Sequence, residues 1–121
     1  MGATLGEFEQ LLLLALLQLG EAEAHGVAIR RAIAERTGRT PSTGAVYTAL
    51  DRLEAKGYVS SRLGEPVPTR GGRPRRFYQL ERAGAKTLAG TLDTLQAMAR
   101  GLRPRLDLVL AGKSVSRRDR R

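Results

Sequence analysis

The chain has 121 residues and a formal net charge of +9, from 21 lysines and arginines against 12 acids. Its length fits a single domain with a small core, and it has no cysteine, which excludes disulfides, thiolate nucleophiles and cysteine-based zinc sites. Residues 113–121 hold five basic residues and one acid, hence +4, which leaves +5 for the body. Such an excess favours a polyanionic partner, in the first place nucleic acid.

Residues 5–19 predict a first helix that is apolar on almost every side, with Leu5, Phe8 and Leu12 among its large side chains. A helix of this kind is buried on more than one side. The surface that packs against its second apolar side belongs either to a second subunit or to the protein's own core. The apolar run 11–17 is too short to span a bilayer, and acids precede it where a signal peptide carries positive charge. We therefore expect a soluble, cytoplasmic protein.

A second helix is expected to open at His25-Gly26 and to end near Thr37, with Gly38 as its C-terminal cap. We interpret His25 as a helix-start residue and not as a metal ligand. Arginines and a glutamate lie outside, and the predicted inward stripe consists of Val27, Ile29, Ala32 and Ile33.

The third helix is expected to begin at Ser42, a good N-cap residue, and to stop at Gly57 after Lys56. Its predicted inward residues are Ala45, Val46, Ala49, Leu50 and Leu53. The residues away from this stripe are small or polar: Thr43, Gly44, Tyr47, Thr48, Asp51 and Arg52. Two helices joined by a short turn, the second with a smooth polar face, indicate a helix-turn-helix.

Two strands are expected next, over 58–63 and 75–80, and the prolines and glycines of 64–74 exclude regular structure between them. The pair predicts a β-hairpin that follows the helix-turn-helix, which defines a winged helix. The tip of this wing is basic, with Arg70, Arg73, Arg75 and Arg76. These arginines bind DNA in our interpretation; a solvated loop is the alternative.

From Ala83 the chain is again expected to be helical, and Pro104 should kink or end that helix. A further short apolar turn is expected over 106–111. The leucine-rich seam, with spacings of 4, 3, 4 and 3 residues, consists of Leu88, Leu92, Leu95, Ala99 and Leu102. The seam predicts a dimerisation helix, although it would also fit packing on the protein's own core.

The predicted fold class is therefore mostly α with a small β-hairpin (α+β), a winged helix-turn-helix with a C-terminal dimerisation helix. The DNA-binding part takes residues 1–82, the dimerisation helix 83–111, and a basic, disordered tail 112–121.

Four stretches, 5–17, 25–29, 44–59 and 71–80, occur in an order that resembles the PadR family of bacterial transcription regulators. The resemblance implies a winged helix whose terminal helix pairs two subunits, and a repressor that binds a pseudo-palindromic operator. It implies a place on the bacterial nucleoid when bound, and a small-molecule effector of unknown identity. Two departures stand out: Leu80-Glu81 replaces the usual Leu-Thr, and the absence of tryptophan argues against drug binding between tryptophans.

We expect double-stranded DNA as the partner, with the third helix in the major groove and the wing on the minor groove or backbone. The expected DNA-binding residues are Ser42, Thr43, Gly44, Tyr47, Thr48, Arg52, Arg70, Arg73, Arg75 and Arg76. The expected dimerisation residues are Leu5, Phe8, Leu12, Leu88, Leu92, Leu95, Ala99 and Leu102.

Three points qualify this prediction. The third helix lacks Arg, Asn and Gln on its leading face, so Thr contacts and DNA shape would supply specificity. Tyr47 would also fit a packing role. No nucleophile–base pair, phosphate loop or metal-ligand spacing is present in the sequence, so we expect no enzyme, cofactor or metal. The alternative functions are a winged-helix protein-interaction module and a non-specific nucleic-acid-binding protein.

Overall fold

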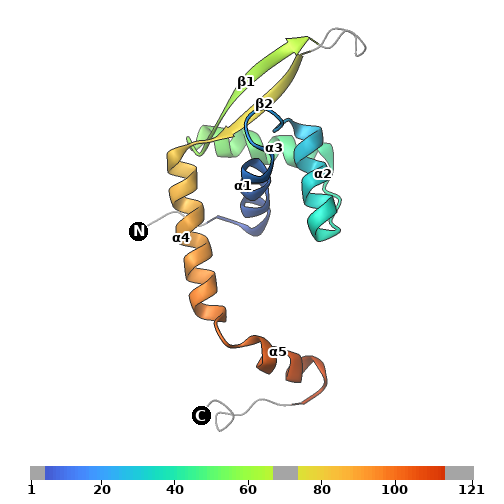
Figure 1. Ribbon diagram of the computed structural model, residues 1–121, viewed down its shortest axis with the longest axis vertical. Coiled ribbons are helices and arrows are strands. Elements are labelled where there is room, and N and C mark those ends of the chain that lie inside the picture. The colour runs from blue at the N-terminus through green and yellow to red at the C-terminus, as the bar shows by residue number, and fades with distance from the viewer. Residues whose placement is uncertain (1–4, 67–73, 114–121) are drawn as a thin grey trace. The chain divides into compact units, whose positions relative to one another are not determined.

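The computed structural model describes residues 5–66 and 74–113. The helices and strands within these ranges are, in chain order, α1 (Glu7–Leu19), α2 (Gly26–Thr37), α3 (Thr43–Ala55), β1 (Val59–Pro66), β2 (Pro74–Leu80), α4 (Arg82–Ala99) and α5 (Arg103–Leu110). Three helices followed by an antiparallel β1–β2 hairpin make a winged helix-turn-helix (Figure 1), which confirms the predicted mostly α fold with a small β-hairpin. The dimerisation role of the C-terminal helix stays a prediction. The chain forms two compact units, Met1–Ala89 and Gly90–Arg121.

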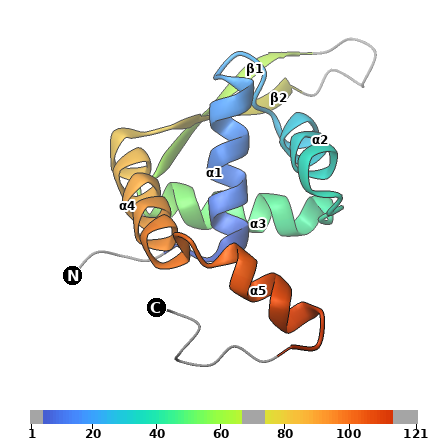
Figure 2. The ribbon, with the colours of Figure 1, turned by 60° about the horizontal axis from the view of Figure 1, so that its bottom comes forward.

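The core of the first unit lies where α1, α2 and α3 meet, and α1 crosses α3 in Figure 2. Leu12 and Leu13 of α1 are completely buried, as are Ile29 of α2 and Leu50 of α3. Burial of these aliphatic side chains supplies the main driving force for folding this unit. It also fixes which side of α3 remains in contact with solvent.

Local capping signals set the bounds of α2 and α3. His25 Nδ1 accepts a hydrogen bond from the Ala28 backbone N–H at 3.3 Å, and Ser42 Oγ accepts one from Ala45 N–H at 3.1 Å. Gly38 ends α2 in the left-handed conformation, with φ of 75°. These contacts confirm the predicted helix starts at His25-Gly26 and Ser42 and the predicted cap at Gly38. They also confirm His25 as a helix-start residue.

Two residues predicted to face inward do not. Val27 is 45% exposed, and Ala45 is also exposed. A helix turns by about 100° per residue, so Val27 lies about 200° from the buried Ile29, on the opposite side of α2. Ala45 lies just past the edge of the buried stripe, which runs through Val46, Ala49, Leu50 and Leu53.

The hairpin is longer than predicted, since β1 reaches Pro66 and β2 starts at Pro74. Its register pairs Val59 with Leu80 and Arg62 with Phe77, and it becomes irregular between Leu63 and Pro66. The prolines were expected to exclude regular structure here. Both strands of a two-stranded sheet are edge strands, however, and an edge strand tolerates a residue without an N–H.

The hairpin is attached to the connection between α1 and α2. Tyr78 N–H donates to the Ala24 carbonyl at 2.8 Å, and His25 forms an isolated antiparallel bridge with Phe77. The start of α2 is therefore tied directly to β2.

In the second unit, α4 ends at Ala99, before Pro104, and Gly101 follows in the left-handed conformation with φ of 75°. Pro104 was expected to kink or end the helix, and the helix does end close to it, between Ala99 and Arg103, a few residues before the proline. Pro104 itself lies in the first turn of α5, where its missing N–H costs no intrahelical hydrogen bond. The short turn expected over 106–111 belongs to this longer helix. No residue of α5 is buried.

Candidate nucleic-acid interface

The N-terminal half of α3 presents small polar side chains to solvent. Thr43, Gly44 and Thr48 are exposed, and a Cβ built on Gly44 meets no atom within 4 Å beyond its chain neighbours and the adjacent backbone of α3. Ser42 uses one lone pair of its hydroxyl as the N-cap, which leaves the hydroxyl hydrogen available to an acceptor. This end of α3 also carries the positive end of the helix dipole. It therefore offers a smooth surface that a polyanion can approach closely.

Tyr47 combines packing with partial exposure. It is 36% exposed, but its ring and hydroxyl lie directly against Gly26, where any side-chain carbon would collide with them. Gly26 is buried in the first turn of α2. The structure therefore supports a packing role for Tyr47. The exposed part of its side chain is still accessible from the solvent side of α3.

Arg52 lies on the exposed side of α3, within electrostatic reach of Glu9 on α1. Burial raises the pKa of Glu9, but the Gly6 backbone N–H, Lys56 and Arg52 lower it more, so the net pKa lies below its ordinary value. Lys56 Nζ stands 3.2 Å from the Glu9 carboxylate. Part of the positive charge at the C-terminal end of α3 is thus compensated within the protein.

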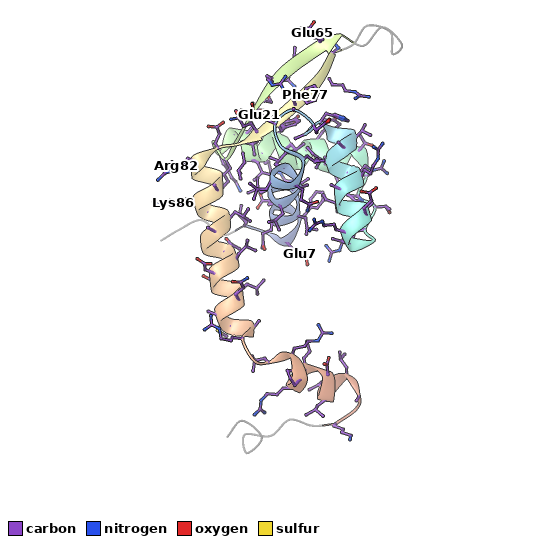
Figure 3. The ribbon with its side chains drawn as sticks, in the orientation of Figure 1. Glu7, Glu21, Glu65, Phe77, Arg82 and Lys86 are labelled. Atoms are coloured by element: carbon purple, nitrogen blue, oxygen red, sulfur yellow. The ribbon has the colours of Figure 1, made fainter. Side chains whose placement is uncertain are left out.

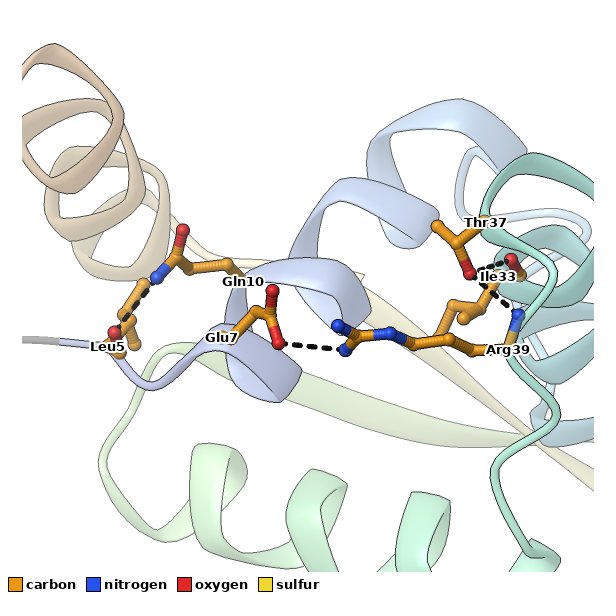
Figure 4. Close-up of polar contacts among 6 residues, drawn as sticks. All are labelled: Leu5, Glu7, Gln10, Ile33, Thr37 and Arg39. Carbon is orange, nitrogen blue, oxygen red and sulfur yellow. Dashed lines mark hydrogen bonds and ion pairs between the residues drawn. The ribbon is translucent and has the colours of Figure 1, made fainter. Parts of the chain in front are cut away.

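Arg39, in the turn before α3, is neutralised in the same way. Its guanidinium donates to Glu7 at 2.8 Å, and this hydrogen bond, followed by the charge of Arg39, lowers the pKa of the Glu7 carboxyl (Figure 4). Thr37 Oγ1 accepts from the Arg39 backbone N–H at 3.1 Å and donates to the Ile33 carbonyl at 2.7 Å, which holds the chain after α2 in place. Arg39 is therefore engaged with α1.

The wing arginines differ in position. Arg75 is half-buried with Nη1 3.3 Å from His25 Nε2, whereas Arg76 is exposed and donates to Ser61 Oγ at 2.9 Å. Successive residues of a strand face opposite sides, so these two arginines lie on opposite faces of the hairpin. Arg70 and Arg73 lie outside the described residues.

Sequence reasoning missed Arg62 on β1. Its guanidinium stands 4.8 Å from the centroid of the Phe77 ring and donates to the Glu21 carbonyl at 3.2 Å. The Phe77 ring in turn meets the edge of His25 at a centroid distance of 5.5 Å. Figure 3 shows Phe77 on the hairpin beside Glu21. A cation opposite an aromatic residue in the predicted hairpin was the signal that could have indicated this pair.

The predicted dimerisation residues fall into two groups. Leu5, Leu12 and Leu88 are 5% exposed or less, so their side chains are occupied by the core of the first unit. Phe8 and Leu92 are half-buried, and Leu95, Ala99 and Leu102 are exposed. Only this second group has surface to offer to another molecule.

A groove of about 400 Å³ lies between α1 and α2, lined mainly by apolar side chains such as Leu14 and Leu17, with Arg36 at one side. Among residues 5–66 and 74–113, no cluster of three or more His, Asp or Glu could hold a metal ion. No helix in the described part of the chain is long and apolar enough to cross a membrane.

The sequence of residues 13–90 matches the model of the transcriptional regulator PadR-like family. No curated protein matches the chain significantly.

The structure is similar to that of TA0346 from Thermoplasma acidophilum, with a TM-score of 0.64, 24% identity and coverage of 90% of this chain and 94% of the other. A PadR family transcriptional regulator from Eggerthella lenta gives a TM-score of 0.63 at 24% identity, covering 83% and 86%. One from Clostridium difficile gives 0.62 at 21% identity, covering 82% and 98%. At these identities the likeness to solved structures shows the fold.

Proposed function

The chain belongs to the PadR-like family of transcriptional regulators, and from this premise we propose that it represses transcription by binding a pseudo-palindromic operator as a homodimer. The family consists of DNA-binding regulators and not of enzymes. The proposal adds the direction of regulation, the two-fold operator and the roles of individual residues.

In this proposal the N-terminal half of α3 enters the major groove. The observation that carries it is the exposed face of Ser42, Thr43, Gly44 and Thr48, which has no bulky side chain and open space around Gly44. A major groove about 12 Å wide admits an α-helix. Small side chains on the approaching face let the helix backbone come closer to the base edges. Tyr47 borders this face and Arg52 reaches a phosphate from further along the helix.

The wing binds the minor groove or the phosphate backbone next to α3. Arg76 donates to Ser61, Arg75 Nη1 lies 3.3 Å from His25 Nε2, and both guanidinium groups keep N–H donors for phosphate oxygens. Arg62, stacked on Phe77, joins them as a third cation of the hairpin. Arg70 and Arg73 remain proposed contacts at the tip, and the tail 112–121 adds non-specific attraction.

The second subunit binds through the C-terminal helical part, residues 83–111, while residues 1–82 contact DNA. Leu95 is 59% exposed and Leu102 is 46% exposed, and both lie in the seam that also includes Leu92 and Ala99. A pseudo-palindromic site with half-sites about one helical turn apart requires such a pair of subunits. A small-molecule effector remains a prediction from the family resemblance.

Selection of bound duplexes from a random library tests the proposal. We expect enrichment of an inverted repeat, and a preference of roughly 10³-fold or more for that operator over a scrambled duplex at physiological salt. Equal release of both duplexes as salt rises would contradict it. That result would favour the alternative of a non-specific nucleic-acid-binding protein. The specific argument for this alternative is that the N-terminal half of α3, residues 43–49, contains no Arg, Asn or Gln.

A further inference from the structure

A shallow hollow of about 260 Å³ lies beside the N-terminus of α3, formed by α2 and the turn that follows it. Two arginines and no carboxylate line it, and the remaining lining is small or apolar. The lining residues are Val27, Arg30, Arg31, Ala34 and Thr40. None of these lining residues has a role in the function proposed above.

The first arginine is held in a fixed position. Arg30 donates its Nε–H to the carbonyl oxygen of Pro41, the residue immediately before the N-cap Ser42. This contact orients the guanidinium at the start of α3 and leaves the N–H groups of its two terminal nitrogens for another acceptor. A cation that is already ordered loses less conformational entropy when it binds an anion.

Neither arginine of the hollow forms an ion pair with an acid of residues 5–66 or 74–113. The ion pairs formed among the described residues use Arg39, Lys56 and Arg103 as their cations. Arg30 and Arg31 belong to none of them, and both side chains are exposed. Two guanidinium groups at one hollow attract an anion more strongly than a single surface arginine does.

We infer that this hollow binds a phosphate group of the DNA backbone next to the half-site contacted by α3. The inference rests on the proposed function, because a duplex in contact with Ser42 and Thr43 passes close to the turn that contains Thr40. Val27 lines the hollow beside the arginines, and the Thr40 hydroxyl adds a donor for a phosphate oxygen. A phosphate contact of this kind fixes the position of the protein on the duplex and carries no sequence information.

The test compares Arg31→Ala with Arg36→Ala. Both substitutions remove one positive charge from α2, but Arg36 lines the groove between α1 and α2 and not the hollow. We expect Arg31→Ala to reduce the slope of log K against log salt by about 0.9, the value for one lost phosphate contact, on the operator and on a scrambled duplex alike. If the variant and the wild type bind equally at 1 M salt, this difference in slope makes the variant bind about 8-fold more weakly than the wild type at 0.1 M salt. Arg36→Ala should change the slope by less than half as much.

Equal slopes for the two variants would overturn the inference while leaving the proposed function intact. Failure of the wild-type chain to prefer any operator would instead contradict the proposed function. Melting temperatures of both variants establish that they fold, since neither arginine is buried.

A second arm distinguishes a DNA phosphate from a free phosphate compound. The DNA-free wild type and Arg31→Ala are each titrated with sodium phosphate in a calorimeter. Phosphate binding that Arg31→Ala removes, together with a DNA salt slope that Arg31→Ala leaves unchanged, would assign the hollow to a free phosphate-bearing ligand and overturn the inference. A DNA salt slope that Arg31→Ala reduces supports the backbone assignment.

Discussion

The two units of the chain differ in how far their large apolar side chains are buried. In Met1–Ala89, Leu12, Leu13 and Leu50 are completely buried. Among residues 90–113 of the second unit no residue is buried, and Leu95, Met98 and Leu110 are 59%, 73% and 73% exposed. The first unit therefore contains the apolar contacts needed for its own fold, whereas the second leaves large apolar side chains exposed to solvent.

The difference in burial indicates which unit suits each proposed function. A unit with its own core can hold α3 and the hairpin in fixed positions, which DNA recognition requires. Helices with exposed leucines gain free energy when another apolar surface covers them. The comparison thus favours DNA binding by the first unit and subunit pairing by the second.

The largest effect is expected in the core of the first unit. Leu50→Ala removes a completely buried side chain and should lower the free energy of unfolding by about 2–5 kcal/mol. The matched substitution Leu110→Ala changes a side chain that is 73% exposed and outside the proposed seam, and should stay within about 0.5 kcal/mol. Urea denaturation followed by circular dichroism measures both. Similar losses for the two variants would abolish the distinction between the units.

The next effect concerns the seam of the second unit. Leu95→Asp places a charge on the proposed interface and should convert the dimer to a monomer, because the charge would lose its hydration there. Thr94→Asp adds the same charge one residue away, outside the seam, and should leave the dimer intact. Light scattering gives the mass of each variant. A dimer that survives Leu95→Asp would remove Leu95 from the interface.

A smaller effect depends on pH and reports on the first unit alone. Burial, followed by the nearby negative charge of Asp51, raises the pKa of Tyr78 to about 12. In the unfolded chain a tyrosine titrates near pH 10. Between about pH 10 and 12 the unfolded state loses this proton first, so stability falls as pH rises, by about 1.4 kcal/mol per pH unit. Below pH 10 the group contributes no pH dependence.

Tyr78→Phe keeps the buried ring and removes the titrating hydroxyl, so this part of the alkaline loss should disappear. Denaturation curves for both proteins at pH 9, 10, 11 and 12 provide the comparison. Parallel pH profiles would show that Tyr78 ionises as easily in the folded state as in the unfolded one.

The winged-helix fold was predictable because its signals are local. Ser42 and Gly38 mark helix ends through their own backbone chemistry, and the buried stripe of α3 follows from its 3.6-residue period. The position of Val27 was also readable from that period, since it lies two residues from Ile29. It was misassigned because an apolar residue was assumed to be buried.

The candidate site was only partly predictable, because much of it depends on contacts between distant segments. The hollow requires the turn at Thr40 to lie beside Arg30 and Arg31, and Arg62 acquires its position from Phe77 across the hairpin. The burial of Leu12 and Leu88 likewise depends on which of several apolar faces the core covers. The spacing of apolar residues identifies the apolar face of a helix, but it does not show which surface covers that face.

The claim that the first unit binds DNA and the second pairs subunits is tested most directly with one glycine from each unit. Gly44 and Gly90 are both exposed helical residues with open space around a built Cβ. Replacement by alanine should stabilise the helix at either site by about 0.5–1 kcal/mol, because alanine has the higher helix propensity. The measurement is the dissociation constant of each variant for the selected operator, alongside its melting temperature. We predict that Gly44→Ala weakens operator binding by about tenfold or more, equivalent to ~1.4 kcal/mol, despite its higher stability, while Gly90→Ala binds like the wild type. Unchanged binding by Gly44→Ala would contradict close approach of α3 to DNA.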